Sequence, residues 1–79
     1  MKVQIEYTDT FCGEANYSWC HRTTLTFRHN ATKRTILRKA KSHMGLKGWR
    51  GKLEDWGDML VFKPWRSCTI LFVTYSVEE

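Results

Sequence analysis

The segment from Cys68 to Val77 constrains the fold of this chain more than any other. Its apolar residues follow one another without strict alternation: Ile70, Leu71, Phe72, Val73 and Tyr75. A continuous apolar run of this length, rich in β-branched and aromatic residues, is typical of a strand that is buried on both faces. We therefore predict a strand at about 68–77 and place it in the centre of a sheet.

Two earlier segments alternate apolar and polar residues, which predicts strands with one buried face. Their apolar positions are all odd-numbered: Val3, Ile5, Tyr7, Tyr17, Trp19, Leu25 and Phe27. We expect strands at about 2–8 and 17–28, with a loop from Asp9 to Asn16 between them. Consecutive strands with a short connection pair most simply as an antiparallel hairpin, here about 2–28.

A further strand is predicted at about 53–63. Its second half, from Met59 to Lys63, is apolar on both faces, and Pro64 ends it. Gly57 and Asp58 interrupt the middle of the segment and indicate either a turn or a bulge.

A helix is predicted at about 31–44, where the sequence contains no Gly or Pro. Its apolar positions have helical spacing and form a stripe suited to packing on a sheet: Ile36, Leu37, Ala40 and Met44. Asn30 is the expected N-cap, with Thr32 as the rival, and Gly45 sits where a glycine that ends a helix belongs.

Together these elements predict a single α+β domain over residues 1–79, in the order β-β-α-β-β. One helix would pack on one face of a four-stranded antiparallel sheet. The second face of the sheet then has no obvious cover, although its strands are apolar. Either the hairpin or the loop around Trp49 folds over it, or it binds a partner protein or a second copy as a homodimer.

Positive charge is concentrated in one stretch, from Ala15 to Lys52. The stretch contains ten of the thirteen Lys and Arg residues and none of the eight acids, although the formal net charge of the whole chain is only +5. Such clustering attracts phosphate backbones or acidic proteins, whereas a solvated helix face would show much of the same pattern. The candidate binding residues lie on the helix and in the glycine-rich loop at 46–52: Arg34, Arg38, Lys41, Lys47, Trp49, Arg50 and Lys52.

The residues that could carry chemistry are scattered. The three cysteines, Cys12, Cys20 and Cys68, are an odd number and show no closely spaced pair of zinc ligands, so we expect neither a metal nor another cofactor. Cys20 and His21 are neighbours on a predicted strand, which directs their side chains to opposite faces. We expect no enzyme, no signal peptide at the start of the chain, no membrane span and a reduced cytoplasmic location.

Two stretches resemble a group of short, mostly uncharacterised proteins of phages and prophages. The first runs from Glu6 to Trp19, and the second comprises Trp56 to Met59 followed by Cys68 to Phe72. The resemblance implies an accessory phage protein in the cytoplasm of the bacterial host. Proteins of this kind, anti-CRISPR proteins among them, commonly inhibit a host or defence protein by occupying its surface.

Two hypotheses about function follow. The first is a small non-enzymatic binding protein that occupies the surface of a host or defence protein and so inhibits it. The alternative is a nucleic-acid-binding protein that uses the basic helix and the 46–52 loop, with Trp49 stacked on a base.

Overall fold

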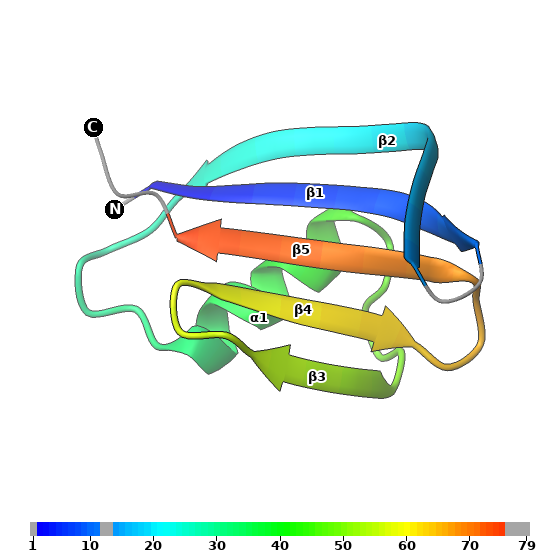
Figure 1. Cartoon of the computed structure of the whole chain (residues 1–79). Coiled ribbons are helices and arrows are strands. Elements are labelled where there is room, and N and C mark those ends of the chain that lie inside the picture. The colour runs from blue at the N-terminus through cyan, green and yellow to red at the C-terminus, as the bar shows by residue number, and fades with distance from the viewer. Residues whose placement is uncertain (1, 12–13, 76–79) are drawn as a thin grey trace.

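The computed structural model describes residues 2–11 and 14–75, which form five strands and one helix (Figure 1). In chain order these elements are β1 (Lys2–Phe11), β2 (Glu14–Thr26), α1 (Lys33–His43), β3 (Gly51–Asp55), β4 (Met59–Pro64) and β5 (Thr69–Tyr75). The strands form one sheet in the order β2-β1-β5-β4-β3, and every neighbouring pair is antiparallel. The helix lies on one face of this sheet, behind β4 and β5 in Figure 1.

The predicted four-stranded sheet with the order β-β-α-β-β is wrong, because the sheet has five strands and the order is β-β-α-β-β-β. The predicted strand at 53–63 is a hairpin of two strands. Gly57 adopts a φ of 92°, and the Trp56 amide donates a 2.9 Å hydrogen bond to the Met59 carbonyl, which closes the turn. Of the two readings of Gly57 and Asp58, the turn is therefore the one that the structure shows.

The central position predicted for the last strand is confirmed, since β5 lies between β1 and β4. Ile70, Leu71 and Val73 are buried, although successive side chains point to opposite faces. The predicted strand extended to Val77, and its last two residues lie outside the described part of the chain.

The helix begins two residues later than predicted, and its N-cap is Thr32 instead of Asn30. The Thr32 side chain accepts a 3.1 Å hydrogen bond from the Thr35 amide. At the other end Gly45 has a φ of 78°, and the Leu46 amide donates a 2.7 Å hydrogen bond to the Lys41 carbonyl. This hydrogen-bond pattern is a Schellman motif, which ends the helix and directs the buried Leu46 into the core.

The main core lies between α1 and the sheet. Ile36 and Ala40 of the helix pack against alternate residues of the three central strands. The strand residues of this core are Val3, Ile5, Tyr7, Leu60, Phe62, Leu71 and Val73. The alternation explains why the odd-numbered positions of β1 carry the apolar residues, as the sequence predicted.

The face opposite the helix is covered at one end by the β1–β2 hairpin. Thr8 pairs with Cys20 but Thr10 pairs with Ala15, which leaves the four residues 16–19 opposite the single residue Asp9. In this irregular bulge of four residues Tyr17 adopts a φ of 58°, and its hydroxyl donates a 3.3 Å hydrogen bond to Glu6 on the face opposite the helix. The hairpin thus covers part of the second face, whereas Trp49 packs against the core on the helix side.

Candidate functional site

The helix presents different chemistry on its two flanks. With 3.6 residues per turn, Arg34 and Arg38 share one flank, whereas Thr35 and Lys39 share the other. Ile36 and Ala40 lie between these flanks and point into the core. Each flank borders a hollow on the surface, so the fold has two candidate binding surfaces.

The first surface is the basic ridge, defined here by Arg34, Arg38 and Lys47. These residues surround a shallow hollow of about 220 Å³ that is also lined by Leu37, Lys41 and Gly48. All three ridge cations are exposed and make no hydrogen bond or ion pair with the described part of the chain. The Schellman turn explains the grouping, because it folds the chain after the helix back beside its last turns.

Lys41 lines the same hollow but has a structural role. Its ammonium donates a 2.6 Å hydrogen bond to the Trp49 carbonyl and lies 4.4 Å from the centre of the Phe62 ring. The side chain is half-buried, and it connects the helix to the loop at 46–50 and to β4. Lys41 therefore contributes charge to the hollow from a fixed position.

The other three predicted residues lie outside this hollow. Trp49 is half-buried against the core, and the Arg66 guanidinium lies 5.3 Å from the centre of its ring. Arg50 is exposed just before β3. Lys52 lies on the opposite face of the sheet, where it pairs with Glu54 at 3.4 Å.

Lys33, the cation in the first turn of the helix, is neutralised by β3. Its ammonium lies 2.8 Å from the Asp55 carboxylate. This hydrogen bond raises the pKa of Lys33 and, together with the Gly57 amide, lowers the pKa of Asp55. Both side chains are about half exposed, so the pair adds little to stability. Unlike Lys33, the ridge cations have no carboxylate partner among the described residues.

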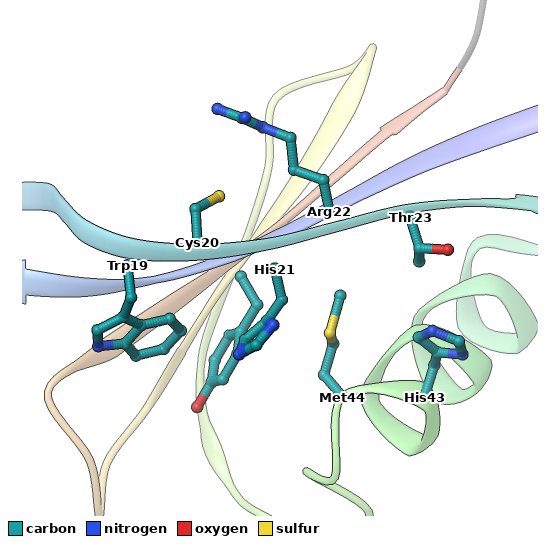
Figure 2. A pocket seen from close by; sticks show the side chains of 8 residues that line it. Trp19, Cys20, His21, Arg22, Thr23, His43 and Met44 are labelled. Atoms are coloured by element: carbon teal, nitrogen blue, oxygen red, sulfur yellow. The ribbon is translucent and has the colours of Figure 1, made fainter.

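The second surface, which the sequence analysis missed, is a groove between β2 and the other flank of α1. Three hollows of about 690, 320 and 510 Å³ follow one another along it and share lining residues. The β2–α1 groove is lined on the strand side by Trp19, His21, Thr23, Leu25 and Phe27, and on the helix side by Ala31, Thr35, Lys39, Ser42, His43 and Met44. Figure 2 shows the hollow with the largest volume of the three, with Trp19, His21 and Thr23 pointing toward the side of Met44 and His43.

The groove exists because the helix covers the centre of the sheet and not its β2 edge. Trp19 contacts Tyr7 edge-on, with 5.3 Å between ring centres, and remains 39% exposed. Leu25 and Phe27 are only partly buried against the core. The odd-numbered apolar face of β2 was visible in the sequence, but the gap beside it depends on the order of the strands.

The cysteines and histidines that the structure describes form no site of known chemistry. Figure 2 confirms that Cys20 and His21 point to opposite sides of β2. Burial raises the pKa of the Cys20 thiol, which makes it a poor nucleophile. Within residues 2–11 and 14–75, no three His, Cys, Asp or Glu side chains are grouped as a metal site would require.

Comparisons of the chain with models of protein families, with curated proteins and with solved structures give no match. Among the described residues, no helix has the length and apolar character needed to cross a bilayer.

Proposed function

We propose that this protein is a non-enzymatic binding protein that covers an acidic surface of a partner protein through the basic ridge. One observation carries the proposal: two exposed arginines on successive helical turns and Lys47 surround an apolar hollow, and no carboxylate of residues 2–11 or 14–75 pairs with them. Arginine is favoured at the energetic centre of protein interfaces.

The composition of the hollow favours a protein partner over nucleic acid. Its floor includes the partly buried Leu37, which would contact an apolar side chain better than a phosphate. Trp49, the aromatic residue expected to stack on a base, is packed against the core with Arg66 over its ring. Stacking by Trp49 would require that packing to be broken.

Nucleic acid remains the second candidate, because the ridge cations have no partner within the described chain. A ridge of this kind would neutralise a few phosphates and release counterions, so the affinity would fall steeply with salt. Among the described residues, three cations without a partner lie at the hollow, Arg34, Arg38 and Lys47, which is few for a dedicated nucleic-acid-binding protein.

The resemblance to phage accessory proteins supports a biological setting for the proposal. In that setting the protein acts in the cytoplasm of a bacterial host and inhibits a host or defence protein by occupying its surface. The fold is consistent with this role in size and chemistry, and the identity of the partner is the object of the experiment.

The test compares two double variants with equal changes in charge. Arg34→Glu/Arg38→Glu reverses the ridge, whereas Lys2→Glu/Lys63→Glu reverses two cations that lie on the opposite face of the sheet. We expect tagged wild type and the Lys2/Lys63 variant to capture the same protein from bacterial lysate treated with nuclease, and the ridge variant to lose it.

Two outcomes would contradict the proposal. Capture that survives reversal of the ridge would show that another surface binds the partner. Capture that disappears with nuclease, accompanied by direct binding to DNA or RNA at low salt, would favour the second candidate.

A further inference from the structure

We propose that the β2–α1 groove binds an extended, acidic peptide segment of a partner protein, which adds as a sixth strand to the free edge of β2. In strand addition, backbone hydrogen bonds supply affinity, and alternate side chains enter pockets beside the edge strand. The inference concerns the flank of α1 opposite the basic ridge and does not depend on the proposed function of the ridge.

The first requirement is a free strand edge, and β2 provides one. It is the outermost strand of an open sheet, since its described pairing is with β1 alone. From Cys20 to Thr26 its pairing with β1 is regular, after the bulge at residues 16–19. Along this part of β2, every second residue directs its backbone N–H and C=O groups away from β1.

The two edges of the sheet differ in how well they are protected against strand addition. The other edge, β3, has only five residues, three of which are the charged Lys52, Glu54 and Asp55. Short length and charge are the usual means of protecting an edge. By contrast, the regularly paired part of β2, from Cys20 to Thr26, has seven residues, of which only Arg22 is charged, and Arg22 pairs with Glu6. Within the described residues, the β3 edge is therefore better protected than the β2 edge.

The second requirement is a set of pockets at strand spacing beside this edge. The largest hollow, of about 690 Å³, is lined by Trp19, Thr23 and Met44, and the next large one, of about 510 Å³, by Leu25, Phe27 and Ala31. Along β2 the two hollows are centred about four to six residues apart, or about 13–20 Å. An added strand would place side chains separated by four or six residues into them, because such residues share one face.

Charge selects the occupant. The helix side of the groove carries the cation Lys39, and Arg28 lies at its far end. Of the described residues that line the three hollows, none is Asp or Glu. A peptide that alternates carboxylates with large apolar side chains would therefore fit both the pockets and the rim.

A second copy of this chain fits less well. Paired through β2, it would offer the segment 19–26, which contains no acidic residue. Each chain would then bring its own Lys39 and Arg28 to an interface whose described lining residues include no carboxylate. Pairing of two copies through their β2 edges is thus disfavoured by the same charges that favour an acidic peptide.

The experiment uses synthetic decapeptides as probes for the full-length protein. The acidic probe alternates Glu with Phe or Val, and its matched control has Lys at each Glu. A third probe is the acidic peptide with every second backbone amide N-methylated. It is prepared in two versions, one for each set of alternate amides, because only one set can face β2. Binding is measured by fluorescence anisotropy and is mapped by amide chemical-shift changes in NMR.

We expect the acidic probe to shift the amides of residues 19–26 and the methyl group of Met44. Methylation in one of the two registers should weaken binding by about tenfold or more, because each lost backbone hydrogen bond contributes to affinity. The Lys control should bind at least about tenfold more weakly. The Arg34→Glu/Arg38→Glu variant should keep its affinity, which separates this inference from the proposed function.

A variant that blocks the groove gives a second measure. Thr23→Phe should fill the largest hollow and weaken the acidic probe, and dispersed NMR spectra must show that the variant is folded. The methylated peptides test the same point without any change to the protein.

Three results would overturn the inference. One is no binding of the acidic probe at millimolar concentration. Another is binding that shifts residues 34, 38 and 47 and is lost in the ridge variant, which would reflect charge at the ridge alone. The third is a dimer in the absence of peptide with the β2 amides protected from exchange, which would show that a second copy occupies the edge.

Discussion

The Lys41 ammonium donates a 2.6 Å hydrogen bond to the carbonyl oxygen of Trp49 and lies over the ring of Phe62. These two contacts hold the loop at 46–50 against the end of the helix. They also fix one wall of the hollow at the basic ridge. A cation expected to bind a partner is thus part of the support for the binding surface.

Replacing Lys41 by Met keeps most of the aliphatic packing and removes the charge. The Trp49 carbonyl loses its donor and the Phe62 ring loses its cation, so we expect the free energy of unfolding to fall by about 1–3 kcal/mol. Urea denaturation followed by Trp fluorescence measures this change. The matched control is Lys39→Met on the opposite flank, which should change stability by less than about 0.5 kcal/mol. Equal effects of the two substitutions would show that Lys41 has no structural role.

The sequence predicted best those elements whose signal is local. The buried run in β5 and the glycine that ends α1 both follow from residues within a few positions of each other. The strand at 53–63 was mispredicted because Gly57 and Asp58 suit a turn as well as a bulge. The φ of Gly57, the hydrogen bond from Trp56 to Met59 and the pairing of Asp55 with Leu60 distinguish two strands from one, and none of these is specified by the residue types alone.

The candidate site was predictable only in part, for a related reason. The spacing of Arg34 and Arg38 places them together on any helix, and the structure confirms this. The same spacing could not separate Lys41 from them, because its role depends on where Trp49 packs. The β2–α1 groove depends on the strand order of the sheet, which no local pattern in the sequence specifies.

The N-cap of α1 can be tested by substitutions at Thr32 and Asn30, the two N-cap candidates in the sequence. Thr32→Ala removes the acceptor of the Thr35 amide and should lower stability by about 1 kcal/mol. Asn30→Ala lies two residues earlier and should change it by less than about 0.5 kcal/mol. Thermal unfolding monitored by circular dichroism measures both. A larger loss for Asn30→Ala would place the start of the helix earlier than the structure does.

Gly51 occupies a position where the β3–β4 hairpin leaves no room for a side chain. A Cβ atom there would lie 2.7 Å from the Pro64 Cα and closer still to the Lys63 carbonyl oxygen. Because both neighbours are backbone, Gly51→Ala should destabilise the protein by about 1–3 kcal/mol. Gly45→Asn is the control, since that site is open and Asn adopts a positive φ readily; it should cost less than about 1 kcal/mol. Urea denaturation compares them, and a tolerated Gly51→Ala would contradict the close packing of β3 on β4.

Asp9 holds the bulge of the β1–β2 hairpin together. Its carboxylate accepts hydrogen bonds from the Ser18 hydroxyl at 2.6 Å, the Asn16 amide group at 3.0 Å and the Ser18 backbone amide at 3.0 Å. These donors, the Ser18 hydroxyl first, hold the pKa of Asp9 well below its ordinary value of 3.8. Since the folded state lowers this pKa, the stabilisation is fully present above the unfolded-state pKa and is lost as the pH falls through the folded-state value.

We therefore expect Asp9→Asn to be less stable than the wild type at pH 7, with a difference that narrows as the pH falls below about 4. The urea midpoints of both proteins at pH 7, 4, 3 and 2 measure that difference. The titration of the other carboxylates largely cancels, because both proteins contain them. Asp58→Asn makes the same change in charge at an exposed turn where the side chain has no hydrogen bond to the described residues, so its effect should be small at every pH. A difference between Asp9→Asn and the wild type that stays constant from pH 7 to pH 2 would mean that the Asp9 charge is not what orders the bulge.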